Sequence, residues 1–99
     1  MALQVKIFVR AKHQILKAAK WWDDNRPAAP DAISIDFNIA IKRLAEHPDM
    51  GEKYAGSRTD GVRRYFLNRV GYFIYYKAEA RTLQVLAFWH AKRGQQPKL

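Results

Sequence analysis

The spacing of apolar residues changes along the chain, and this change limits the folds that the sequence can adopt. In the opening stretch LQVKIFVR, Val5, Ile7 and Val9 alternate with Lys6, Phe8 and Arg10, which predicts a short strand with one buried face. From residue 11 onward the apolar residues recur every three or four positions instead. That period predicts an amphipathic helix whose buried stripe contains Ile15, Ala18, Ala19 and Trp22.

A second helix follows after a short proline-containing turn. The segment NRPAAPD reverses the chain, and the helix that comes next ends before Pro48. Its predicted core face contains Ile33, Phe37, Ala40, Ile41 and Leu44. Two helices joined by a short link predict an antiparallel helical hairpin.

Three strands are predicted in the remaining part of the chain. Residues 49–60 are polar and contain two glycines, so they are expected to form a surface loop. Residues 61–67, 72–77 and 82–90 are rich in β-branched and aromatic residues and are separated by short turns, which favours an antiparallel meander. The order β-α-α-β-β-β predicts the α+β class: a helical hairpin packed on one face of a four-stranded antiparallel sheet that includes the first strand.

The length of 99 residues fits one domain, predicted over residues 1–94, with residues 95–99 as a flexible C-terminal tail. The absence of cysteine excludes disulfides and thiolate metal sites and suits a reducing cytoplasm. No apolar run is long enough to cross a bilayer, so no membrane association is expected.

The formal net charge is +9, and the positive charge is concentrated in the second part of the chain. Residues 1–57 contain nine Lys/Arg and seven Asp/Glu, whereas residues 58–99 contain nine Lys/Arg and two Asp/Glu. Such a surface attracts nucleic acid, a nucleoprotein assembly or an acidic protein. A basic protein- or nucleic-acid-binding module without toxic or catalytic activity also has this charge.

One cluster of residues suits catalysis on RNA. Histidine is a common general acid or base, so His90 could take that role, and Arg63, Arg64 and Arg93 could stabilise a phosphate. No carboxylate lies in the same strands to orient the histidine, however, so a structural histidine that closes the last strand is the favoured interpretation. The three histidines lack metal-ligand spacing, and no metal or cofactor is expected.

Two further features could bind a partner. Ile35 and Ile39 lie opposite the predicted core stripe of the second helix, where they could contact another protein, although scattered exposed aliphatic residues are common. Aromatic residues interleaved with arginines in the last three strands could stack nucleic-acid bases. Packing within the sheet is the favoured role for these aromatic side chains.

Several motifs resemble the RelE/ParE superfamily of bacterial type II toxins, and the resemblance extends over nearly the whole chain, up to Gly94. The first is a helix end of the form L-x-x-x-P-x-x-G, followed by G-x-R, aromatic-x-I-x-Y and V-L-x-x-x-H-x-x-R. In this sequence the motif residues are Leu44, Pro48, Gly51, Gly61, Arg63, Tyr72, Ile74, Tyr76, Val85, Leu86, His90 and Arg93.

The resemblance implies a growth-inhibiting toxin that an acidic antitoxin neutralises. RelE-like members cleave mRNA on the ribosome, whereas ParE-like members poison DNA gyrase and have no nuclease chemistry of their own. The stretch VLAFWHAKRG is more similar to the ParE type, and no tyrosine follows residue 76, so gyrase is the expected target and mRNA cleavage is the alternative. The residues expected to bind target or antitoxin are Arg63, Arg64, Lys92, Arg93, Ile35 and Ile39.

Overall fold

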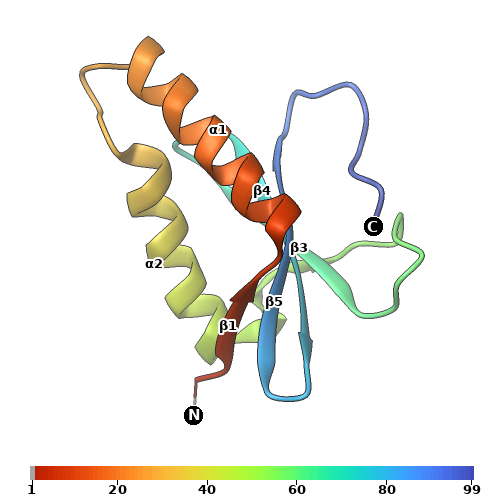
Figure 1. The fold of residues 1–99 in the computed structure, drawn as a ribbon. Coiled ribbons are helices and arrows are strands. Elements are labelled where there is room, and N and C mark those ends of the chain that lie inside the picture. Colours follow the sequence, from red (N-terminus) through yellow and green to blue (C-terminus); the bar gives the residue numbers. More distant parts are fainter. Residues whose placement is uncertain (1) are drawn as a thin grey trace.

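The computed structural model describes residues 2–99 and shows a helical hairpin against one side of a twisted sheet (Figure 1). The hairpin consists of α1 (Val9–Asn25) and α2 (Ala32–Glu46). The remaining elements are β1 (Gln4–Ile7), the 3-10 turn η1 (Pro48–Met50), β2 (Glu52–Lys53), β3 (Val62–Leu67), β4 (Tyr72–Glu79) and β5 (Thr82–His90). The predicted α+β class and the order of the main elements are confirmed.

The hydrophobic core lies between the two helices and the sheet. The predicted core stripe of α2 is buried throughout, and it packs on buried residues of β4 and β5 such as Ile74 and Phe88. Phe37 meets Phe88 edge to face, with ring centroids 5.8 Å apart. The stripe of α1 is less completely buried. Trp22 lies partly buried, and its indole donates a 2.9 Å hydrogen bond to the Ala29 carbonyl, which ties α1 to the link between the helices.

The sheet differs from the prediction in the number and direction of its strands. It has five strands in the order β1-β5-β4-β3-β2, and β1 runs parallel to β5, so the sheet is mixed and mostly antiparallel. The fifth strand, β2, comprises Glu52 and Lys53, which lie inside the expected surface loop. They pair with Arg64 and Arg63 of β3. A strand this short carries no apolar alternation. Alternation also does not distinguish parallel from antiparallel pairing.

Because β1 lies at the edge of the sheet, its apolar side is less buried than the sequence predicts. Val5 and Ile7 pair with the buried residues Leu83 and Val85, yet they remain 42% and 38% exposed. An edge strand has a neighbour on one side only, so its side chains are incompletely covered. The prediction that the strand includes Val9 is wrong, because Val9 begins α1 and is exposed.

The start of α1 protects part of the β5 edge that β1 leaves uncovered. The backbone amide of Phe8 donates to the Val85 carbonyl at 3.0 Å, just after β1 ends. Within α1, the side-chain oxygen of Gln14 accepts a 2.8 Å hydrogen bond from the backbone amide of Phe88. A side chain of α1 therefore satisfies a strand amide that no neighbouring strand reaches.

Candidate functional site

Arg63 and Arg64 project from opposite sides of the sheet. Arg63 pairs with Tyr76, which belongs to the core beneath the helices. Arg64 pairs with Tyr75, which is buried outside that core. Successive side chains of a strand alternate between faces. The two arginines, grouped together in the sequence interpretation, therefore belong to two different surfaces.

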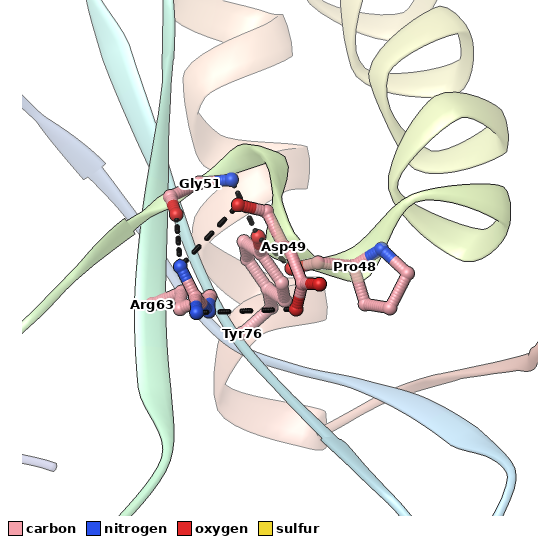
Figure 2. A network of polar contacts seen from close by, with 5 residues as sticks. All are labelled: Pro48, Asp49, Gly51, Arg63 and Tyr76. Carbon is pink, nitrogen blue, oxygen red and sulfur yellow. Dashed lines mark hydrogen bonds and ion pairs between the residues drawn. The ribbon is translucent and has the colours of Figure 1, made fainter.

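On the helix side, Arg63 holds the segment that follows α2 (Figure 2). Its guanidinium group donates to the carbonyl oxygens of Gly51 at 2.7 Å and Asp49 at 3.3 Å, and it lies 3.9 Å from the Asp49 carboxylate. The Arg63 side chain is only 25% exposed. Its hydrogen-bonding capacity is thus used mainly within the chain, to hold the η1 segment against β3.

Tyr76 completes the same network from β4 (Figure 2). Its hydroxyl donates to the Pro48 carbonyl at 2.6 Å and accepts from the Gly51 amide at 2.9 Å. Burial raises the pKa of the Tyr76 hydroxyl, and the hydrogen bond from Gly51 offsets part of that rise. Pro48 and Gly51 come from one motif of the sequence, and Arg63 and Tyr76 come from two others; the structure joins them in one network.

Gly51 is required in this network by the close approach of its neighbours. A Cβ atom at residue 51 would clash with the Tyr76 hydroxyl and would lie 2.8 Å from the Arg64 carbonyl. The sequence interpretation did not connect the glycine of P-x-x-G with the tyrosine of β4. Nothing in their spacing predicts that they meet, because 24 residues separate them and the pairing of β3 with β4 brings them together.

On the other side of the sheet, Arg64 lies over aromatic rings. Its guanidinium carbon lies 4.3 Å from the centre of the Phe73 ring and 5.7 Å from that of Tyr54. It also forms an ion pair with Glu52 and donates a long, 3.4 Å hydrogen bond to the Tyr75 hydroxyl. The hydrogen bond with Tyr75, followed by that with Glu52, raises the pKa of Arg64. This arginine is a fixed cation with its apolar surface packed on rings.

His90 closes β5. Its Nδ1 accepts a 3.1 Å hydrogen bond from the Lys92 amide, and its carbonyl accepts a 3.1 Å hydrogen bond from the Arg93 amide. The imidazole meets the edge of Tyr72 with ring centroids 4.9 Å apart. These contacts organise the turn after the strand, and no carboxylate of the described residues lies in contact with the imidazole.

Lys92 and Arg93 lie on the exposed turn after β5. The Arg93 guanidinium carbon lies 3.8 Å from the centre of the Trp89 ring, a distance typical of a cation–π contact. Between α1 and this strand end is a hollow of about 240 Å³ whose lining includes Lys17, His90 and Arg93. Two cationic side chains and an imidazole therefore surround the end of β5.

The four residues of the nuclease hypothesis do not converge on one point. Arg63 and His90 share a side of the sheet, but they pair with Tyr76 and Tyr72, which are about 13 Å apart along β4. Arg64 projects from the opposite side. Within residues 2–99 no group of three His, Asp or Glu residues is arranged to hold a metal ion. No helix of this part of the chain has the length and apolar composition needed to span a membrane.

Ile35 and Ile39 form an exposed apolar surface on α2. They are 48% and 49% exposed, at positions one helical turn apart. Ile39 also borders a hollow of about 160 Å³ between α2 and β3, together with Arg43 and the exposed Phe66. The structure thus adds Phe66 to the apolar surface suggested by the two isoleucines.

These features define a class: a small α+β protein with a helical hairpin on one side of a mixed sheet and cationic side chains at the end of its last strand. The sequence model of the ParE toxin of the type II toxin–antitoxin system parDE matches residues 5–94. The chain belongs to this family of ParE toxins.

A solved structure supports the same fold. It is described as the chromosomal ParDE toxin–antitoxin system from P. aeruginosa, and it aligns with a TM-score of 0.73 at 17% sequence identity. The alignment includes 92% of the present chain and 98% of the other. A search among curated protein sequences finds no match. The similarity at this identity concerns the fold, and the family membership comes from the sequence model.

Proposed function

We propose that this ParE-family toxin inhibits DNA gyrase in the cytoplasm and is neutralised by a cognate acidic antitoxin. Arg63, Arg64 and His90 lie apart on the sheet, and this observation supports gyrase instead of mRNA as the proposed target. Cleavage of RNA needs a general base and a phosphate-stabilising cation around the same phosphate. A protein that traps another enzyme needs surface complementarity instead.

The net charge supports the choice of an acidic antitoxin. A surface with a net charge of +9 accelerates association with an acidic chain and favours its ordering along the toxin. We assign direct contacts with target or antitoxin to Lys92, Arg93, Ile35 and Ile39, whose side chains are accessible. Arg63 and Arg64, each with a side chain 25% exposed, contribute by shaping the two sides of the sheet.

Expression of the chain alone should stop growth, and co-expression with an acidic protein encoded by the adjacent reading frame should restore it. In a purified assay, the protein should make gyrase accumulate protein-linked breaks in plasmid DNA. Translating extracts should show no new codon-positioned mRNA ends. Unimpaired growth with a folded protein would contradict the toxin function.

The variant His90→Gln separates the two possible activities. A gyrase inhibitor should keep most of its DNA-break activity with this change, provided that the strand end still folds. A nuclease that used His90 as its base should lose about 10²–10⁴-fold in mRNA cleavage. Ribosome-dependent mRNA cuts that disappear in His90→Gln would overturn the proposal.

Charge reversal at the strand end tests the proposed contacts. The double variant Lys92→Glu and Arg93→Glu should weaken binding to gyrase or to the acidic antitoxin, and the loss should shrink at high salt because exposed charges are screened. The matched control is the double variant Lys12→Glu and Arg81→Glu, which makes the same change in net charge at exposed residues outside the assigned contacts. Equal losses in both variants would show that only the total charge matters.

A further inference from the structure

Residues 95–99, here called the strap, return across the side of the sheet that the helices leave open. Figure 1 shows the chain leaving β5, looping away and coming back beside the connection between β2 and β3. Lys98 and Leu99 line a cavity of about 310 Å³ together with Lys77, Gln84 and Leu86 of β4 and β5. Pro97 is buried. The strap thus occupies a surface although the sequence predicts a flexible tail, and the division at residue 94 stays a prediction.

The hydrogen bonds of the strap all run in one direction. The Trp89 indole donates to the Gln95 carbonyl at 2.6 Å, and Arg10 donates to the Lys98 carbonyl at 2.8 Å. The Leu99 carbonyl accepts from the Arg58 amide at 2.9 Å and from the Ser57 hydroxyl at 3.2 Å. The Tyr54 hydroxyl donates to the side-chain oxygen of Gln96 at 3.0 Å. In each of these bonds the body of the protein is the donor and the strap is the acceptor.

A small second buried layer lies on this side of the sheet. Val62, Tyr75 and Ala87 are almost completely buried, yet none of them belongs to the core beneath the helices. Their strand positions place them on the side where Arg64 and Lys77 project. The strap and the connection between β2 and β3 lie there, so these segments provide the cover that the helices cannot.

The strap is chemically a poor occupant of its own site. Four of its five hydrogen bonds use backbone carbonyls, which any extended peptide carries. Its single charged residue, Lys98, lines the same cavity as Arg10 and Lys77, and the only acid in that lining, Glu79, already forms a 3.5 Å ion pair with Lys77. Like charges held close together repel. A segment with carboxylates in place of Gln96 and Lys98 would supply acceptors to the same donors and remove that repulsion.

We propose that the strap is displaceable, and that the row of donors beneath it binds an extended acidic peptide segment of a partner protein. The donors that define this row are Arg10, Tyr54, Ser57, the Arg58 amide and the Trp89 indole. This inference goes beyond gyrase inhibition and does not need it. Its test uses only purified protein and peptides, so its failure is distinct from a failure of the toxin assays.

The probe is the peptide EEPEL, which keeps the proline and leucine of the strap sequence QQPKL and replaces its other residues with glutamate. The peptide KKPKL is the control for charge. Binding to the full chain is measured by NMR through the indole N–H signal of Trp89, identified by its loss in Trp89→Phe. EEPEL should move this signal and KKPKL should not. Binding of EEPEL that leaves the Trp89 indole signal unchanged would overturn the site.

Two full-length variants test displacement. Pro97→Gly gives the strap more freedom when detached, which should increase the accessible fraction of the site and tighten EEPEL binding about fivefold. Lys98→Glu should hold the strap more firmly and weaken EEPEL binding. Lys42→Glu on α2 makes the same change of charge away from the site and controls for the loss of general attraction. Equal affinity in Pro97→Gly and the original chain, or equal weakening by Lys98→Glu and Lys42→Glu, would overturn displacement by the strap.

Discussion

The hydroxyl group of Tyr76 accepts a hydrogen bond from the amide of Gly51 and donates one to the carbonyl of Pro48 in the same turn. This pair joins β4 to the segment after α2, and Arg63 reinforces the junction from β3. These motif residues have a structural role, because they fix how the helical hairpin connects to the sheet.

Removal of the Tyr76 hydroxyl should destabilise the fold. In Tyr76→Phe, the Gly51 amide and the Pro48 carbonyl lose their partner in a buried environment, so the free energy of unfolding should fall by about 1–3 kcal/mol. Urea unfolding measures this change. Tyr65→Phe is the control, because no hydrogen bond of the Tyr65 hydroxyl is present among the described contacts. Equal effects of the two changes would contradict the role of the network.

The same hydroxyl should make stability fall in alkaline solution. Burial raises the pKa of Tyr76 above its ordinary value of 10.0, so the folded chain holds this proton more tightly than the unfolded chain. Its contribution is complete below about pH 10 and is lost as the pH rises through the folded pKa. Burial also raises the pKa of Tyr72 and Tyr54, so the informative quantity is the difference between the original chain and Tyr76→Phe. The variant should show the smaller loss of stability as the pH rises above about 10.

A methyl group at residue 51 should be poorly tolerated. Gly51→Ala places a carbon within contact of the Tyr76 hydroxyl and the Arg64 backbone, and the backbone cannot move without disturbing β3. We expect a loss of about 1–3 kcal/mol, the range for overpacked sites. Gly94→Ala is the control, since no atom lies within 4 Å of the position of its added Cβ. Thermal unfolding of both variants measures the contrast.

The turn between β4 and β5 should be open to stabilisation. Ala80 and Arg81 link the strands as a two-residue turn with φ values of 49° and 65°, a region that favours glycine and asparagine. Arg81→Gly should raise the free energy of unfolding by roughly 0.5–1 kcal/mol. Arg81→Ala removes the same charge without the freedom of glycine and should not stabilise. A gain in both variants would assign the effect to charge instead of backbone strain.

Much of the fold could be predicted because the apolar residues of the helices repeat regularly. Phe37 and Leu44 are buried where the period of α2 places them. The parallel pairing of β1 with β5 could not be predicted, because alternation reports which face is buried and not which strand lies alongside. The two-residue β2 and the buried position of Pro97 carry no periodic signal at all.

The candidate site was less predictable, for reasons that differ between residues. Adjacent residues of a strand point to opposite faces, so the period of two already separates Arg63 from Arg64. The distance between Arg63 and His90 depends instead on the register of three strands, which no local pattern specifies. The packing of Arg93 on Trp89 likewise depends on the turn that follows β5.

The parallel pairing of β1 with β5 has a consequence for how the toxin is made. Gln4 lies opposite Thr82, so the first strand leaves the ribosome long before its neighbour has been synthesised. At about 5–20 residues per second, β1 waits roughly 4–16 s for β5. A chain interrupted before β5 would contain both helices but lack the strand that joins β1 to the sheet. Translation products that lack β5 therefore cannot complete the native sheet, and the toxin acquires its full surface only after β5 has been synthesised.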